Sequence, residues 1–110
     1  MMTYVRAAEV AEIPTGNMKM VKIGEKEVLV VNVNGKFFAI PNRCTHANGD
    51  LSQGTLETNV VTCPRHGSQF DVTNGKSLRG PKIGFLKLNT KDQPSFKVKV
   101  EGDDVLVEID

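Results

Sequence analysis

The sequence predicts an all-β protein, and three observations lead to this expectation. The dipeptides Asn34-Gly35 and Asn74-Gly75 supply the positive φ angles that tight hairpin turns require. Between such turns, short segments either alternate apolar and polar residues or form runs rich in β-branched residues. Helical character is confined to one stretch, AAEVAEI (7–13), which predicts a helical turn before Pro14.

Each expected strand follows from its local pattern. MKMVKI (18–23) alternates with a period of two. EVLVVNV (27–33) is a β-branched, apolar run that ends at Asn34-Gly35, and KFFAI (36–40) is expected to return beside it. The remaining expected strands are VVT (60–62), QFDV (69–72), FKVKV (96–100) and VLVEI (105–109).

Length, charge and termini limit the class of protein. With 110 residues, the chain is expected to form a single domain over residues 1–110. The net charge of +1, without long runs of like charge, argues against a nucleic-acid-binding protein. Neither a signal peptide nor an apolar run of the ~20 residues needed to cross a membrane is recognisable. We therefore expect a cytoplasmic chain, without a membrane anchor, whose cysteines stay reduced.

All cysteines and histidines of the chain lie in two short segments, RCTHANGDL (43–51) and TCPRHGSQF (62–70). Each segment contributes one Cys and one His, and both segments are expected to be loops at strand ends. Two cysteines and two histidines suit either a structural zinc ion or a [2Fe–2S] cluster. Because zinc fingers usually pair like ligands within one turn, the mixed pairs favour the cluster. Gly49, Gly54 and Gly67 would allow close approach of the backbone.

These segments resemble the Rieske iron–sulfur motif, C-x-H…C-x-x-H. The pattern is carried by Cys44-Thr45-His46 and by Cys63-Pro64-Arg65-His66-Gly67. The similarity extends over nearly the whole chain, through the flanking stretches GKFFAIPNRCTH, LSQGTLE (51–57), HGSQFDVTNGK (66–76) and GDDVLVEI.

The resemblance implies a fold, a cofactor and a ligand set. The implied fold is a Rieske-like antiparallel β-sandwich with a small inserted cluster-binding subdomain, whose loops occupy about residues 41–80. Cys44 and Cys63 would bind the buried iron of one [2Fe–2S] cluster. His46 and His66 would bind the outer iron.

Further positions are informative by the same resemblance. Ser68 matches a serine whose hydroxyl donates a hydrogen bond to cluster sulfur, and Pro81 matches a proline loop that covers the cluster. High-potential members carry two more cysteines, joined in a disulfide, where this chain has Gly49 and Arg65. They also carry a tyrosine where this chain has Phe70. The chain therefore resembles the soluble ferredoxins, and we expect a reduction potential in the lower half of the Rieske range.

Family members of this length are ferredoxins, which implies a soluble one-electron carrier and not an enzyme. The implied partners are redox proteins, namely a ferredoxin reductase as donor and a terminal oxygenase or similar enzyme as acceptor. We expect the carrier to be a monomer. One alternative is the small Rieske subunit of an assimilatory nitrite reductase. The other, from ligand chemistry alone, is a zinc-stabilised interaction module.

Overall fold

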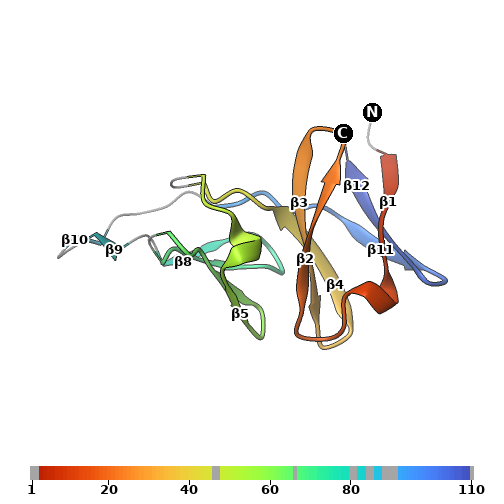
Figure 1. The fold of residues 1–110 in the computed structure, drawn as a ribbon, viewed down its shortest axis with the longest axis horizontal. Helices are drawn as coiled ribbons and strands as arrows, with labels where there is room; N and C mark the ends of the chain where they lie inside the picture. The colour runs from red at the N-terminus through yellow and green to blue at the C-terminus, as the bar shows by residue number, and fades with distance from the viewer. Residues whose placement is uncertain are drawn as a thin grey trace.

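The computed structural model describes residues 3–45, 48–65, 67–79, 82–83, 86–87 and 92–109, with the backbone alone for 82–83 and 86–87. Its strands pair antiparallel into two three-stranded sheets, a four-stranded sheet and a two-stranded ribbon. Figure 1 shows the two three-stranded sheets at one end of the molecule and the four-stranded sheet beside them. None of the helices in the described residues is long and apolar enough to cross a membrane.

The first sheet joins the beginning of the chain to its end, in the order β1-β12-β11. Its strands are β1 (Thr3–Glu9), β11 (Val98–Glu101) and β12 (Asp104–Ile109). The second sheet has the order β2-β3-β4 and contains β2 (Met18–Ile23), β3 (Lys26–Val33) and β4 (Lys36–Pro41). Asn34 (φ 53°) and Gly35 (φ 90°) form the expected hairpin turn between β3 and β4.

The stretch AAEVAEI (7–13) is only in part the helical turn that its sequence predicts. Residues up to Glu9 belong to β1, and the 3-10 helix η1 covers only Val10–Glu12. Ala8 pairs with Val105 of β12 and is buried in the core. Pairing and burial therefore outweigh the helix preference of alanine at this position.

Strand β3 lies between two apolar cores, which explains why its sequence is a continuous apolar run. Val28 and Val30 face the core between the two three-stranded sheets. Leu29 and Val31 face the opposite side and pack toward the four-stranded sheet. All four side chains are fully buried. The second core therefore couples the sandwich to the four-stranded sheet.

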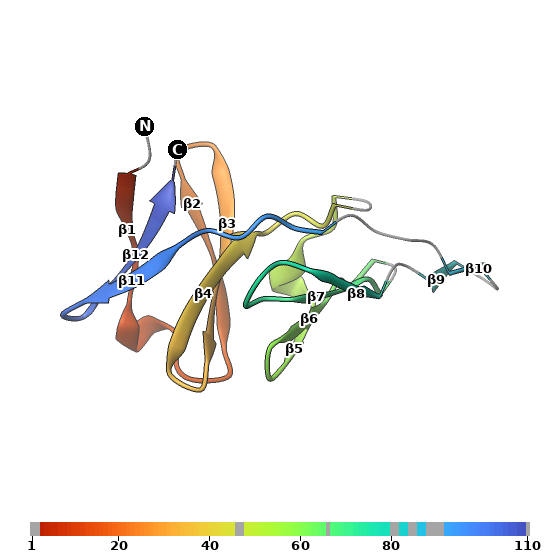
Figure 2. The same cartoon turned by 180° about the vertical axis from the view of Figure 1, so that it is seen from behind.

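The four-stranded sheet has the order β5-β6-β7-β8 and belongs to a segment inserted between β4 and β11 (Figure 2). The insertion contains η2 (Leu51–Gln53), β5 (Thr55–Glu57), β6 (Val60–Thr62), β7 (Gln69–Asp71), β8 (Ser77–Arg79), β9 (Lys82–Ile83) and β10 (Leu86–Lys87). The expected antiparallel sandwich with a small inserted subdomain is thus confirmed. The strands not expected from sequence are β1, β5, β8 and the β9–β10 ribbon.

Candidate functional site

Two loops of the inserted subdomain close with the same pattern of backbone hydrogen bonds. In the first loop, Cys44 N–H donates to Gly49 O (2.8 Å), and Asn48 N–H donates to Cys44 O (2.9 Å). In the second loop, Cys63 N–H donates to Ser68 O (2.8 Å), and Gly67 N–H donates to Cys63 O (3.1 Å). The fourth residue after each cysteine has a positive φ, 57° at Asn48 and 80° at Gly67. Each cysteine therefore begins a loop of the same length and hydrogen-bond pattern.

Both thiols are buried, and the two loops are in contact. Cys44 and Cys63 are each 3% exposed, belong to the second core and form no disulfide. A Cβ built on Gly49 would lie 2.6 Å from Cys63 Sγ and 3.1 Å from Arg65 Cγ. The first loop can therefore pass the second only with a glycine at position 49. Gly49 and Arg65 also face each other, as expected for positions that a disulfide joins in high-potential members.

Ser68 has a buried hydroxyl without a hydrogen-bond partner in the described structure. Ser68 is 0% exposed, and its Oγ makes no hydrogen bond. A buried hydroxyl left unpaired costs about 1–3 kcal/mol, so such groups are rare. An ordinary turn serine would instead form a hydrogen bond with its own backbone. The environment of Ser68 fits a site whose acceptor is supplied by a bound group.

Gln93 is a buried polar residue that sequence reasoning missed. Its Nε2 donates to Pro41 O (3.0 Å) and Arg43 O (2.9 Å), and its Oε1 accepts from Thr45 N–H (2.9 Å). Its backbone N–H donates to Gly75 O (2.7 Å). Gln93, 2% exposed, thus fixes the start of the first loop against the turn that follows β7. No local sequence pattern signals this role, because the partners lie far along the chain.

A second polar network fixes the other side of the first loop. The buried Asn42 donates from Nδ2 to Asp50 Oδ1 (2.8 Å), and Asp50 accepts a further bond from the N–H of Ser52 (3.0 Å), which caps η2. The Ser52 hydroxyl and the Asn42 amide hold the pKa of Asp50 below its usual value, although burial opposes the shift. Leu51 N–H donates to Asn42 O (2.9 Å) and closes the segment.

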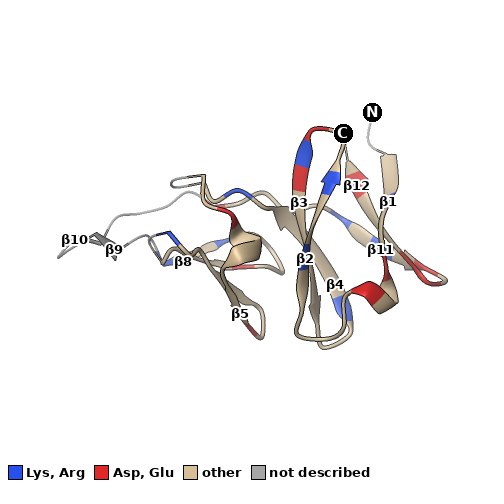
Figure 3. Cartoon of the chain, in the orientation of Figure 1, with Lys and Arg blue, Asp and Glu red and all other residues tan. Residues whose placement is uncertain are grey.

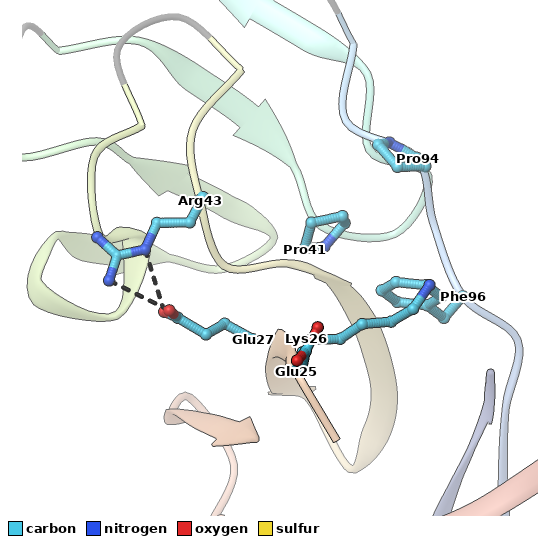
Figure 4. A pocket seen from close by; sticks show the side chains of 7 residues that line it. All are labelled: Glu25, Lys26, Glu27, Pro41, Arg43, Pro94 and Phe96. Atoms are coloured by element: carbon cyan, nitrogen blue, oxygen red, sulfur yellow. Dashed lines mark hydrogen bonds and ion pairs between the residues drawn. The ribbon is translucent and has the colours of Figure 1, made fainter. Parts of the chain in front are cut away.

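An open cleft lies at the junction of the sandwich and the inserted subdomain, with a volume of about 520 Å³ (Figure 4). Arg43 and Glu27 form an ion pair at its edge, with Nε 3.1 Å from Oε1. The cleft is lined by Glu25, Lys26, Glu27, Pro41, Arg43, Pro94 and Phe96. It therefore contains neither cysteine and is separate from the site in the loops.

Three of the six residues predicted for the site are placed by the structure, namely Cys44, Cys63 and Ser68. His46, His66 and Pro81 lie outside the described residues. Within the described ranges, no three His, Cys, Asp or Glu side chains converge on one point, and neither histidine is among them. Phe70 is fully buried in the second core, as its place in an apolar strand predicts.

Comparison with known proteins gives consistent results. The model of the Rieske [2Fe-2S] domain family matches residues 3–97. The ferredoxin component of biphenyl 2,3-dioxygenase from Rhodococcus jostii (strain RHA1) is 37% identical, covering 99% of this chain and 95% of that protein.

Solved structures agree in fold. The ferredoxin of carbazole 1,9a-dioxygenase from Nocardioides aromaticivorans IC177 has a TM-score of 0.79 at 28% identity, covering 96% of each chain. A chain in the complex of reduced oxygenase and oxidized ferredoxin in carbazole 1,9a-dioxygenase has a TM-score of 0.82 at 29% identity, covering 94% of this chain and 99% of that one. With its two matching loops and its sandwich, the chain belongs to the Rieske [2Fe-2S] domain family.

Proposed function

We propose that this chain is a one-electron carrier of the ferredoxin type, with one [2Fe–2S] cluster bound by Cys44, His46, Cys63 and His66. The observation that carries the proposal is the pair of matching loops, each of which begins with a buried thiol. When bound, the cluster accepts and releases one electron at a time. The relatives described above are ferredoxin components, which favours a carrier over a nitrite reductase subunit.

The residues in the loops fit such a group. Thiolates are the usual ligands of iron–sulfur iron, and burial at 3% exposure protects both cysteines from water. The unpaired hydroxyl of Ser68 is available to donate a hydrogen bond to a sulfur atom. Gln93 holds the first loop through Thr45 N–H, one residue beyond Cys44. Pro81 is assigned to the cover over the site by its position in the family pattern.

The partners follow from the relatives, whose names place them in dioxygenase systems. We propose a ferredoxin reductase as the donor and a terminal oxygenase or similar redox enzyme as the acceptor. The chain acts as a single Rieske-type domain over residues 1–110 and as a monomer. We also propose a cytoplasmic location, where thiols remain reduced and available as ligands.

Metal analysis of the purified protein tests the proposal. We expect two iron and two acid-labile sulfide per chain, a brown colour and an electron paramagnetic resonance signal in the reduced state. Cys44→Ser and Cys63→Ser should each lose the iron, whereas Ser77→Ala, a half-buried serine on β8, should retain it. Stoichiometric zinc without iron or sulfide would instead establish the zinc-stabilised interaction module.

A further inference from the structure

Charge is distributed unequally between the two ends of the molecule. Residues 42–93, which include the inserted subdomain, contain seven Lys or Arg and four Asp or Glu, a net charge of +3. The rest of the chain contains seven and nine, a net charge of −2. Figure 3 shows acidic residues at η1 and at the β11–β12 turn, at the end opposite the loops. The net charge near zero therefore results from a positive end and a negative end of the molecule.

Three of the four carboxylates of the subdomain accept hydrogen bonds from neighbouring residues, and the fourth lies away from the second loop. Asp50 accepts hydrogen bonds from Ser52, and Asp71 accepts from the backbone and hydroxyl of Thr73. Asp92 accepts from Ser77 N–H (2.8 Å). Glu57 pairs with Val60 beside the β5–β6 turn, at the end of the hairpin remote from Cys63.

Two exposed arginines lie in or against the second loop, whereas Arg43, beside the first loop, is paired with Glu27. Arg65 belongs to the second loop and contacts the first at Gly49. Arg79 reaches the second loop, where its Nη2 donates to Gly67 O (3.3 Å). We call Arg65 and Arg79 the basic rim.

An exposed leucine accompanies the basic rim. Leu78 is 53% exposed, and only Leu78 and Val100 are large exposed apolar residues in the described part of the chain. Gln69 pairs with Arg79 while Phe70 pairs with Ser77, so Leu78 is the extra residue of a β-bulge. Strand β8 is the edge of its sheet in the described residues. An exposed apolar side chain next to arginine is typical of a protein-binding surface.

We propose that Leu78 and the basic rim form the surface through which this carrier docks on an acidic face of its redox partners. The proposal deepens the function proposed above and rests on it, because only a loaded carrier exchanges electrons there. Attraction between the rim and partner carboxylates orients the chain with its loops toward the partner, and the acidic end is repelled. Leu78 then contributes an apolar contact inside the polar rim.

A protein is favoured over a polyanion as the occupant. Two arginines and a leucine form a small patch, whereas nucleic-acid surfaces depend on the neutralisation of many phosphates. The position beside the thiol-bearing loops also gives a redox partner a short path for the electron.

Voltammetry of the loaded protein on charged electrodes tests the orientation. A gold electrode with a carboxylate-terminated monolayer stands in for the acidic partner face, and an amine-terminated monolayer serves as its opposite. One electron per chain passes from the electrode to the oxidised protein. We expect transfer on the carboxylate surface to be on the order of tenfold faster than on the amine surface, and to slow as salt is added. Surface plasmon resonance gives the adsorbed amount on each surface.

Two variants that change the net charge equally distinguish an effect of the basic rim on the rate from an effect of the net charge. Arg79→Glu should slow transfer on the carboxylate surface by on the order of tenfold. Lys36→Glu changes an exposed lysine at the end of β4 remote from the first loop, and should leave the rate unchanged. Equal rates on the two surfaces, or an equal loss in both variants, would overturn the proposal. A protein without iron, and without a redox wave on either surface, would instead refute the proposed function.

Leu78 and the class of partner are tested separately. On a monolayer that mixes methyl and carboxylate groups, wild type should transfer faster than on carboxylate alone, and Leu78→Asn should lose this gain. The same gain in Leu78→Asn would refute the apolar contact. Wild type should not sediment with phosphatidylserine vesicles. Sedimentation that Arg79→Glu abolishes would assign the surface to a membrane instead of a protein.

Discussion

Replacement of Ser68 by alanine should lower the reduction potential of the loaded protein. Ser68 is fully buried, and its Oγ has no hydrogen-bond partner in the described residues. The residue closes the loop that begins at Cys63, because its carbonyl accepts the Cys63 N–H at 2.8 Å. A hydroxyl in this place can donate to a sulfur of the bound group. Such a bond favours the reduced state, which carries more negative charge, and therefore raises the potential.

The size of the effect follows from the strength of one hydrogen bond. A net contribution of ~1–2 kcal/mol, at about 59 mV per 1.4 kcal/mol for one electron, predicts that Ser68→Ala lowers the potential by roughly 40–80 mV. The substitution removes only Oγ from a buried site, so the fold and the iron content should be retained.

The assay is voltammetry on wild type, Ser68→Ala and Ser77→Ala, with iron measured in each sample. Ser77→Ala is the matched control, since Ser77 lies on β8 outside both loops. Its potential should equal that of wild type. If Ser68→Ala keeps its iron and its potential stays within a few millivolts of wild type, Ser68 does not contact the bound group and the reasoning fails.

Four further predictions concern stability and loading. Gly49→Ala should lower the iron content, because its Cβ would lie 2.6 Å from Cys63 Sγ. Gly24→Asn is the control and should keep the iron, because Gly24 has a positive φ that asparagine tolerates and open space around it. A fully loaded Gly49→Ala would contradict the contact. Gln93→Leu removes three side-chain hydrogen bonds and should lower the free energy of unfolding, measured by urea titration, by about 2–4 kcal/mol. An unchanged urea midpoint of unfolding would show that water replaces these bonds. Thr58→Gly should raise the free energy of unfolding by about 0.5–1 kcal/mol, because a β-branched residue at φ 54° is strained; a less stable variant would refute this. Because hydrogen bonds hold the pKa of Asp50 below its unfolded-state value of about 4, the charged carboxylate stabilises the fold above that pH. This contribution is lost as pH falls through the folded pKa, so the thermal stabilities of wild type and Asp50→Asn should converge between about pH 6 and 3. A constant difference between them would rule this out.

Features that depend on neighbours along the chain could be predicted from the sequence alone. The Asn34-Gly35 turn follows from the positive φ of two adjacent residues, and the strands beside it follow from their own apolar patterns. The ligand motif was equally local, because each loop begins with its cysteine and closes within five residues. Both the all-β class and the family were therefore accessible from sequence.

Tertiary structure alone decided the features that depend on distant partners. Strands β1 and β8 form because they pair with β12 and β7, although β1 has no regular alternation and β8 is too short to be recognised from its sequence. Gln93 looks like an ordinary polar residue until folding brings it against Pro41, Arg43 and Thr45. The exposure of Leu78 results from a bulge in the pairing of β7 with β8. Hydrogen bonding and burial between distant segments are properties of the folded chain, so no local pattern could have predicted them.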